Sequence, residues 1–376
     1  MRWWPSLRRN TLARWGALLL FILYLGALGS DFLSPSDPLV GQVNGALLPP
    51  TRIYWRDAAG RWLGPHVYPT TQGPLNLETG EQALIVDRSD PVAIQFLARG
   101  YAYRWLALSL PLPVWTAQGV EIKDLPVIPG IASDRHLFTT AGRGYLNLLG
   151  TDDQGRDQWS RLLLGSRISL SIGLVGIVIT FPLGVFLGGL SGYLGGWVDS
   201  LLMRLVEVLM TIPSVYLLVA LAAVLPPGLT SPQRFLLIVL ITSLVNWAGL
   251  ARVIRGQVLS IKEQTFVQAA QAMGASPLAI LRRHVLPQTA TYVVIAATLT
   301  VPSFIVAESV LSLIGLGIEQ PDASWGNMLS LATNASILIL QPWLVWPPAL
   351  LIVLAVLAFN LVGDGLRDAL DPRHSP

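Results

Sequence analysis

The sequence predicts an all-α polytopic membrane protein with six transmembrane helices and a β-rich insertion between the first two. Three observations lead to this fold class. Of the 376 residues, 52% are hydrophobic and only 12% are charged, against about 25% charged in an ordinary soluble domain. The mean hydropathy is +0.56. The uncharged runs are also long enough to cross a bilayer core, which takes about 20 apolar residues in a helix.

The composition excludes several classes of protein. The chain has no cysteine, so disulfides, Cys-ligated zinc, iron–sulfur clusters and thiol catalysis are excluded. A net charge of +3 with scattered basic residues predicts no nucleic-acid partner. A phosphate-binding loop needs Gly-Lys-Ser/Thr, whereas Lys123 and Lys262, the two lysines, both follow isoleucine. We therefore expect no ATP hydrolysis by this chain.

Six runs with little or no charge are the predicted spans. In chain order they are Trp15–Ser30, Ile168–Val198, Val208–Gln233, Phe235–Ala251, His284–Ala307 and Leu344–Gly363. The first run follows a basic segment, as a signal peptide would. However, Leu28-Gly29-Ser30-Asp31 is a weak cleavage site and the apolar stretch is long, so an uncleaved helix is favoured.

The distribution of Lys and Arg sets the predicted orientation. With the N-terminus inside, the inner segments 1–14, 252–290 and 364–376 hold eleven basic residues, and the short outer loops hold one, Arg234. This predicts that both termini are cytoplasmic. Arg156, Arg161 and Arg167 precede the second span on the outer side and oppose the rule. We assign them to the long outer segment.

Residues 34–150 are predicted to form a β-rich extracytoplasmic domain. Residues 52–55 and 61–63 flank Asp57–Gly60, which is typical of a hairpin. Residues 83–86 read as another strand, and Asp90-Pro91 begins a new element. The predicted organisation is therefore 1–33 for the cytoplasmic N-terminus and first helix, 34–150 for the insertion, and 151–376 for five further helices with a cytoplasmic loop at 252–290.

Within the second span, glycines recur every four residues, at Gly184, Gly188, Gly192 and Gly196. Such a face lets helix backbones approach closely, so it is predicted to pack inside a helix bundle. Prolines also interrupt the spans, and they fit either helices that rearrange or a static bundle. They are Pro182, Pro213, Pro302, Pro347 and Pro348.

Ionisable residues inside spans are costly and call for an explanation. Arg204 and Glu207 are three residues apart on one helical face and are expected to pair near the inner interface. Glu308 lies deeper in its span. Two roles are open for it: lining a polar pathway, or pairing across a subunit interface.

No catalytic or metal-binding constellation is predicted. The acidic turn Thr151–Asp157 does not have the ligand spacing of a calcium loop. We expect it to begin a helix, with Thr151 or Asp152 as the N-cap. The four histidines are dispersed, and no His-x-x-Glu-His or Gly-x-Ser-x-Gly motif is found. These observations argue against a membrane-embedded hydrolase.

The inner loop carries the most specific pattern. Residues 262–273 have helical composition, and Gly274 is predicted to end that helix. Ser276 as N-cap and Pro277 at the first position then restart a short helix, which is expected to stop at Leu286-Pro287. The first helix carries one predicted apolar patch, made of Phe266, Val267, Ala269, Ala270 and Met273. Such an elbow suits the groove of another protein, or lies on lipid headgroups.

This loop resembles the EAA loop of binding-protein-dependent ABC importer permeases, through Gln268-Ala269-Ala270-x-x-x-Gly274 and Leu286-Pro287. Gln268 replaces the glutamate of that pattern. Three further stretches are similar to the C-type inner-membrane subunit of the oligopeptide/dipeptide/nickel branch. They are Leu149–Asp157 with Ser166–Leu170, Leu313–Gly317 with Ser324–Gly326, and Gly363–Pro372. The outer segment is longer than is usual in this branch.

The resemblance implies the fold of a type I ABC importer permease and an ATPase-coupling role for the inner loop. The implied coupling residues are Gln268, Ala269, Ala270, Gly274, Ser276, Pro277, Leu286 and Pro287. The implied partners are a homologous second permease, two cytoplasmic ATPases that bind ATP and Mg, and an extracytoplasmic solute-binding protein. The chain itself would then be no enzyme and carry no cofactor.

The implied location is the bacterial cytoplasmic (inner) membrane, and the implied cargo is a peptide. Nickel or another small solute is an alternative cargo. A membrane-anchored extracytoplasmic binding module is the alternative from a different class. The insertion would dock the solute-binding protein, gate the pore mouth, or cap the helices passively.

Overall fold

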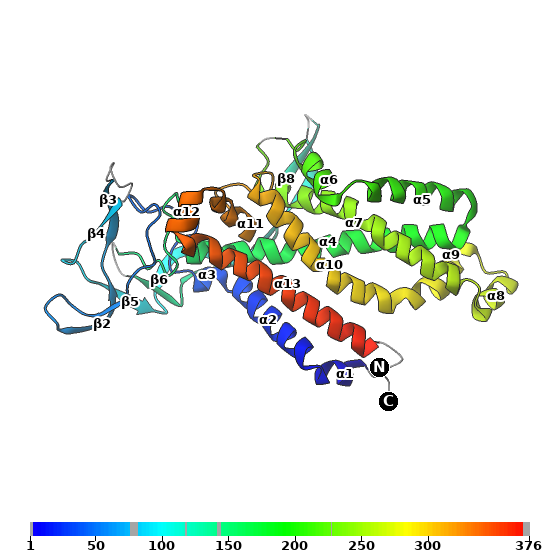
Figure 1. The fold of residues 1–376 in the computed structure, drawn as a ribbon, viewed down its shortest axis with the longest axis horizontal. Helices are drawn as coiled ribbons and strands as arrows, with labels where there is room; N and C mark the ends of the chain where they lie inside the picture. Colours follow the sequence, from blue (N-terminus) through cyan, green and yellow to red (C-terminus); the bar gives the residue numbers. More distant parts are fainter. Residues whose placement is uncertain (1–2, 76–81, 117–118, 141–143, 227, 371–376) are drawn as a thin grey trace.

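The computed structural model describes residues 3–75, 82–116, 119–140, 144–226 and 228–370. A long bundle of helices carries a β-rich unit, with most of the strands, at one end, and a helical loop containing α8 (Thr265–Ala272) and α9 (Pro277–Ile280) lies at the other (Figure 1). We call these the β end and the elbow end. The strand pair within residues 108–128 stands apart from the other strands and contacts the helix Ser231–Ile261. Four residues used in the sequence argument, Arg2, Asp371, Pro372 and Arg373, lie outside the described residues.

Within the described residues, five helices are long and apolar enough to cross a bilayer. They are α2 (Thr11–Leu28), α4 (Gln158–Leu194), α7 (Ser231–Ile261), the stretch Pro277–Leu313 that ends in α10 (Ala290–Leu313), and α13 (Pro342–Leu370). Each coincides with one predicted run. The shorter helices are α1 (Trp3–Arg9), α3 (Ser30–Leu33), α11 (Trp325–Met328) and α12 (Ala335–Leu340).

The span predicted over Val208–Gln233 is not one continuous helix. The end of α5 (Gly196–Thr211) and all of α6 (Ser214–Ala222) lie in this run, and the two helices are bent by 87° relative to each other. Pro213 sits at the bend, where it has no N–H to donate. Ile212 takes the extended conformation (φ −83°, ψ 125°) that residues before proline favour. The pair amounts to one broken span at most, which makes six the upper number of spans in the part of the chain that the structure describes.

Three glycines of α4 bring its backbone against α7. A Cβ added at Gly188 would lie 2.4 Å from the carbonyl oxygen of Ala251. A Cβ added at Gly184 or Gly192 would lie 2.8 Å from atoms of α7. Three of the four predicted glycines therefore form a helix-packing face, as small residues at this spacing do in membranes.

Gly196 does not belong to this face, contrary to the prediction. α4 ends at Leu194, and Gly195 and Gly196 both have positive φ, at 66° and 57°. A Cβ added at Gly196 would meet nothing within 4 Å. The two glycines let the chain reverse into α5 because the left-handed region carries no steric penalty for glycine.

All strands of the described chain lie between residues 54 and 140. One antiparallel sheet has the order β1 (Tyr54–Arg56), β2 (Trp62–Val67), β5 (Val92–Phe96), β10 (Phe138–Thr140). Three two-stranded ladders pair β3 (Thr70–Leu75) with β4 (Gln82–Val86), β6 (Arg99–Trp105) with β9 (Ile131–Arg135), and β7 (Leu108–Thr116) with β8 (Gly119–Ile128). Val67, Val92, Ile94 and Leu146 form a small core.

The hairpin predicted at residues 52–63 is confirmed, because β1 pairs antiparallel with β2. Its turn is closed by the carboxylate of Asp57, which accepts hydrogen bonds from the N–H groups of Ala59 (2.9 Å) and Arg61 (2.8 Å). Gly60 supplies the positive φ of 81°. β4 contains the strand predicted at 83–86, and β5 follows Asp90-Pro91 as expected.

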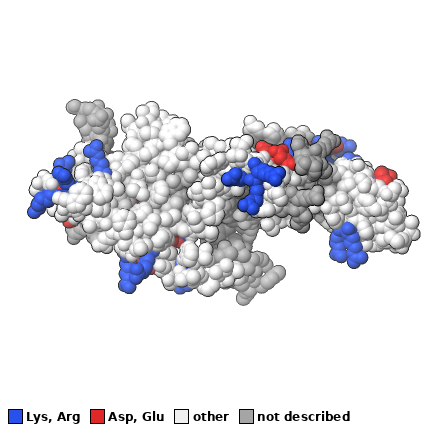
Figure 2. Space-filling model, turned by 90° about the horizontal axis from the view of Figure 1, so that it is seen from below, with Lys and Arg blue, Asp and Glu red and all other residues white. Residues whose placement is uncertain are grey.

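The β-rich unit is attached to the ends of α2 and α3. The indole N–H of Trp105 donates to the carbonyl of Leu28 at 2.8 Å, and the N–H of Leu137 donates to the carbonyl of Phe32 at 2.8 Å. The first and last described helices, α1 and α13, lie side by side, and the side-chain amide of Asn10 beside them donates to the carboxylate of Asp368 at 3.3 Å (Figure 1). On the face seen in Figure 2, charged side chains gather in separate groups with uncharged surface between them, as a membrane protein requires.

The contact between α4 and α7 yields a matched pair of substitutions. Gly188→Ala should lower stability by about 1–3 kcal/mol, because its Cβ would press on backbone. Gly256→Ala should leave stability unchanged or raise it slightly, since a Cβ there meets nothing within 4 Å and alanine is the better helix former. Thermal unfolding in detergent, followed by the fluorescence of the 13 tryptophans, measures both. Equal melting temperatures would contradict close packing of the two helices.

Candidate functional site

The elbow is a short helix followed by a sharp turn. α8 (Thr265–Ala272) ends where Gly274 takes a φ of 80°. The N–H of Gly274 donates to the carbonyl of Gln271 at 2.9 Å, and the N–H of Ala275 donates to the carbonyl of Ala270 at 3.2 Å. α9 (Pro277–Ile280) then begins with Ser276 at the N-cap position. The predicted end of one helix and start of the next are both confirmed.

The predicted stop at Leu286-Pro287 is wrong. After α9 the backbone passes through a π-helical turn, Leu281–Val285, and a 3₁₀ turn, Leu286–Thr289, and continues directly into α10. A proline ring clashes with the carbonyl four residues earlier in a regular α-helix. The change of helical pitch around Pro287 accommodates the ring without ending the helix.

The apolar residues of α8 lie on two faces and not on one patch. Val267 and Ala270 are buried, at 0% and 2% exposed, in a cluster with residues of α4, α7 and α9. Phe266 and Met273 are exposed, Met273 by 81%, and Ala269 is exposed beside them. The elbow is thus held to its own chain by one face and presents the other outward.

Polar contacts join the elbow end to two long helices. The amide of Gln271 on α8 donates to the hydroxyl of Tyr193 at the end of α4, at 3.2 Å. Arg255 on α7 forms a two-pronged ion pair with Asp199 on α5, at 2.5 and 2.6 Å. Asp199 also accepts from Ser191 on α4. The bond between Gln271 and Tyr193 thus ties the elbow directly to α4, and Asp199 ties α4 to α5 and α7.

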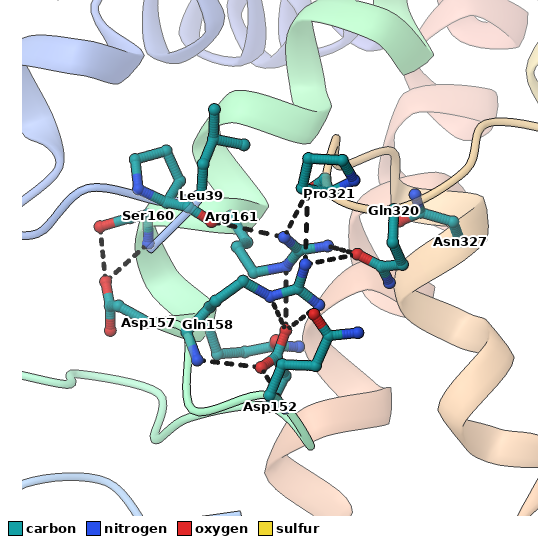
Figure 3. Close-up of polar contacts among 12 residues, drawn as sticks. Leu39, Asp152, Asp157, Gln158, Ser160, Arg161, Gln320, Pro321 and Asn327 are labelled. Atoms are coloured by element: carbon teal, nitrogen blue, oxygen red, sulfur yellow. Dashed lines mark hydrogen bonds and ion pairs between the residues drawn. The ribbon is translucent and has the colours of Figure 1, made fainter. Parts of the chain in front are cut away.

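A buried group of charges holds the β end (Figure 3). Oδ2 of Asp152 lies 2.7 Å from Nη2 of Arg156 and 3.2 Å from Nε of Arg161, and all three side chains are 2–3% exposed. The side-chain oxygen of Gln320 accepts from Nη1 of Arg156 at 2.6 Å and from Nη2 of Arg161 at 3.0 Å. The carbonyl of Pro321 accepts from Nη1 of Arg161 at 2.9 Å.

These contacts give a physical reason for the arginines that oppose the predicted orientation. Arg167 pairs with Asp31 at 2.5 Å, and Arg234 pairs with Glu319 at 2.8 Å. Together with the pairing of Arg156 and Arg161, each outer arginine considered in the sequence argument has an acidic partner. The sequence carried a signal for one pair, since Asp152 and Arg156 are four residues apart, but the contribution of Gln320 required the fold.

The predicted N-cap is also wrong. α4 begins at Gln158, and its N-cap is Asp157, whose Oδ2 accepts from the N–H and the hydroxyl of Ser160 at 2.8 and 2.5 Å. Thr151 instead fixes the loop at residues 45–48, by donating to the carbonyl of Gly45 and accepting from the N–H of Leu48. Burial raises the pKa of the Asp157 carboxyl to about 7, against the lowering effect of its hydrogen bonds with Ser160.

Both roles predicted for Glu308 stay predictions, and within this chain its side chain is enclosed by three helices. Its side chain is 0% exposed within the chain itself. Oε1 accepts from the hydroxyl of Ser312 at 2.7 Å, and Oε2 lies 3.5 Å from the hydroxyl of Ser169. The hydroxyl oxygen of Ser169 in turn accepts from the N–H of Trp325 at 3.0 Å. Glu308 thus joins α10, α4 and α11 from within.

The pairing of Arg204 with Glu207 is confirmed, with Nη1 and Oε2 3.1 Å apart on α5. Both side chains are exposed, by 80% and 49%, so the pair contributes little to stability. Among the described residues, no group of three or more histidine, aspartate and glutamate side chains could hold a metal ion.

Two family models match the chain. Residues 181–376 match the binding-protein-dependent transport system inner membrane component, and residues 1–50 match the N-terminal TM domain of oligopeptide transport permease C. The first match contains the elbow and covers more than half of the chain. Most of the β-rich unit lies between the two matches.

Several named proteins are similar in sequence. The dipeptide transport system permease protein DppC of Bacillus subtilis is 43% identical over 60% of this chain and 68% of its own. The oligopeptide permease OppC of Haemophilus influenzae is 40% identical over 61% and 71%. The glutathione permease GsiD of Pectobacterium atrosepticum is 38% identical over 60% and 72%. Among solved structures, the inward-facing MetNI methionine ABC transporter has a TM-score of 0.42 and 21% identity, over 56% of this chain and 96% of that chain.

Removing the carboxylate of Asp152 from the buried group of charges should lower the stability of the fold. Asp152→Asn leaves two arginines buried without a counter-charge, and we expect a loss of about 3–5 kcal/mol in the free energy of unfolding. Asp134→Asn is the matched control, because Asp134 pairs with Arg99 at 3.6 Å on the exposed surface and such pairs contribute about 0–1 kcal/mol. The melting temperatures of both variants in detergent test this, and similar values would refute the role of Asp152.

The raised pKa of Asp157 predicts a pH dependence of stability. Between pH 4 and 7 the folded chain keeps a proton on Asp157 that the unfolded chain has lost, so stability falls as pH rises through this window. Asp157→Asn should remove this fall, which is on the order of 2 kcal/mol between pH 5 and 8. Melting curves at several pH values measure it. Asp153→Asn, at an exposed neighbour, should keep the dependence of the unmodified chain.

Proposed function

The chain belongs to the family of binding-protein-dependent transport system inner membrane components, and from this we propose that it is a permease subunit of an ATP-driven peptide importer. The observation that carries the proposal is the family match over residues 181–376. This match includes a rigidly attached elbow whose outward face is unpartnered within the described chain.

Peptides are the proposed cargo because of what the similar proteins are named for. Dipeptide, oligopeptide and glutathione permeases are similar to this chain at 38–43% identity. All three cargos contain peptide bonds, although they differ in length and charge. The proposal is therefore a peptide class and not one peptide.

The proposed topology has six spans, with α5 and α6 forming one bent span. Both termini and the elbow lie in the cytoplasm, and the β-rich unit lies outside. The distribution of basic residues supports this. The four arginines beside the spans at the β end, Arg156, Arg161, Arg167 and Arg234, are paired with acids, whereas the inner segments 1–14, 252–290 and 364–376 hold eleven basic residues. The proposed location is a bacterial cytoplasmic membrane.

In the proposed mechanism, the outward face of α8, with Phe266, Ala269 and Met273, docks into a partner ATPase that binds ATP and Mg. Closure of the ATPases would displace the elbow. Its attachments through Tyr193 to α4, and through buried Val267 and Ala270 to the cluster it shares with α7, would turn that displacement into a tilt of the long helices. A second permease would complete the pathway, and a solute-binding protein would deliver the peptide at the β end.

Two measurements test this proposal. Purification of the tagged chain in mild detergent, with companions identified by mass, should recover a second permease and one or two ATPases. Proteoliposomes containing the recovered complex, supplied with its solute-binding protein, should then take up labelled peptide only with ATP. A chain that purifies alone or only with itself would favour a membrane-anchored binding module, and uptake of metal ions without uptake of peptides would overturn the proposed cargo.

Two substitutions at neighbouring residues can distinguish the role of the outward face of α8 from that of its inward face. Ala269→Glu should abolish recovery of the ATPases and lower uptake at least ten-fold, with an unchanged melting temperature, because Ala269 is exposed. Ala270→Glu should instead lower the melting temperature, because Ala270 is 2% exposed in an apolar cluster and buried charges are costly.

Ala59→Glu, at the exposed tip of the β1–β2 hairpin, is the control for that pair and should leave recovery of the ATPases unchanged. If Ala269→Glu keeps its ATPases and its uptake, α8 is not the docking face.

A further inference from the structure

A groove lies between α4 and the elbow and is separate from the outward face of α8. Its volume is about 440 Å³. Apolar side chains and two adjacent arginines line it, among them Phe186, Leu278, Leu281, Arg282, Arg283 and Leu286. No acidic residue of the described chain contributes to the lining.

The two arginines have no partner within the chain. Arg282 and Arg283 are both exposed, and neither has a hydrogen bond or ion pair with any described residue. They lie in the π-helical turn, between Leu281 and Val285, which are buried against the bundle. The turn therefore holds two guanidinium groups outward on a segment that is fixed from behind.

The groove lies nearer to the apolar body of the bundle than α8 does. α8 contacts α4 at Tyr193, whereas Phe186 of the groove is seven residues earlier on the same helix. At 1.5 Å per residue this separates the two levels by about 10 Å along α4. The position of the groove along α4 is fixed by close packing of Leu286 against α4, because a Cβ added at Gly189 would lie 2.8 Å from Leu286. Phe186 is still within the uncharged run of α4, so the arginines lie where apolar surface gives way to charged surface.

We propose that this groove binds an anionic phospholipid of the inner leaflet, with Arg282 and Arg283 on the phosphate and the exposed side chains of Phe186 and Leu278 against an acyl chain. Adjacent guanidinium groups suit a phosphate, to which they donate several hydrogen bonds. Phe186 is 48% exposed and Leu278 is 61% exposed, which is apolar surface that an acyl chain would cover. Basic pockets between membrane helices on the cytoplasmic side bind such lipids. The inference uses the orientation proposed above but not the transport of peptides.

Native mass spectrometry of the full chain in detergent tests this directly. After delipidation, dioleoyl-phosphatidylglycerol should bind at least ten-fold more tightly than dioleoyl-phosphatidylcholine and should raise the melting temperature. The double variant Arg282→Gln with Arg283→Gln should lose this preference. Leu278→Glu, at an exposed position in the same groove, should lose it as well through charge repulsion, and it serves as a second test should the double variant not fold.

The matched control is Arg56→Gln with Arg88→Gln, which removes two exposed arginines from the β-rich unit and should bind phosphatidylglycerol like the unmodified chain. Equal binding of the two lipids, or unchanged binding by both groove variants, would overturn the proposal. Stabilisation by inorganic phosphate at the same level as by the lipid would also overturn it in favour of a free-anion site. Because each readout is binding, a failure here is distinguishable from a failure of peptide uptake.

Discussion

The structure depends above all on the contact between α4 and α7. Gly184, Gly188 and Gly192 bring the two backbones together over about two turns, and in a bilayer such packing replaces the hydrophobic driving force that is absent between helices. α4 has 37 residues, or about 55 Å at 1.5 Å per residue, so it reaches from the buried charges at the β end to the elbow. Both functional ends are therefore positioned by one helix, and its partner α7 fixes the direction of that helix.

The charges at the two ends are arranged in opposite ways, and this supports the proposed mechanism. At the β end, Asp152, Arg156 and Arg161 are buried together, and burying ions is tolerated only when each is paired and hydrogen-bonded. That arrangement ties the loop before α4 to the loop after α10 through Gln320 and fixes their geometry. At the elbow end, Arg255 and Asp199 form a partly exposed ion pair. Arg282 and Arg283 are exposed and have no ion-pair partner among the described residues. One end is thus built for rigidity, and the other presents charge to whatever lies outside the chain.

Much of the fold follows from hydrophobicity and turn chemistry. The sequence predictions that were wrong concern places where several residues carry the same local signal. The long spans and the Asp57–Gly60 hairpin are local features, so the sequence was sufficient for them. Proline marks both the sharp bend at Pro213 and the uninterrupted helix at Pro302, and only packing distinguishes these two outcomes. Thr151, Asp152 and Asp157 are all capable N-caps. Asp157 takes the role because the other two side chains bind Leu48, Gly45 and the buried arginines.

The candidate site shows the same limit. Helical periodicity identifies α8 as amphipathic, but it does not say which residues face inward. Phe266 and Val267 lie about 100° apart around the helix, as do Ala269 and Ala270. Only the cluster shared with α4, α7 and α9 decides that Val267 and Ala270 face inward. Once that face is fixed, the π-helical turn that precedes Pro287 determines where Arg282 and Arg283 lie. Within one loop, α8 and the groove with Arg282 and Arg283 are thus separated by about 10 Å along α4. An ATPase docked on α8 would leave the groove free, at the level of the lipid headgroups.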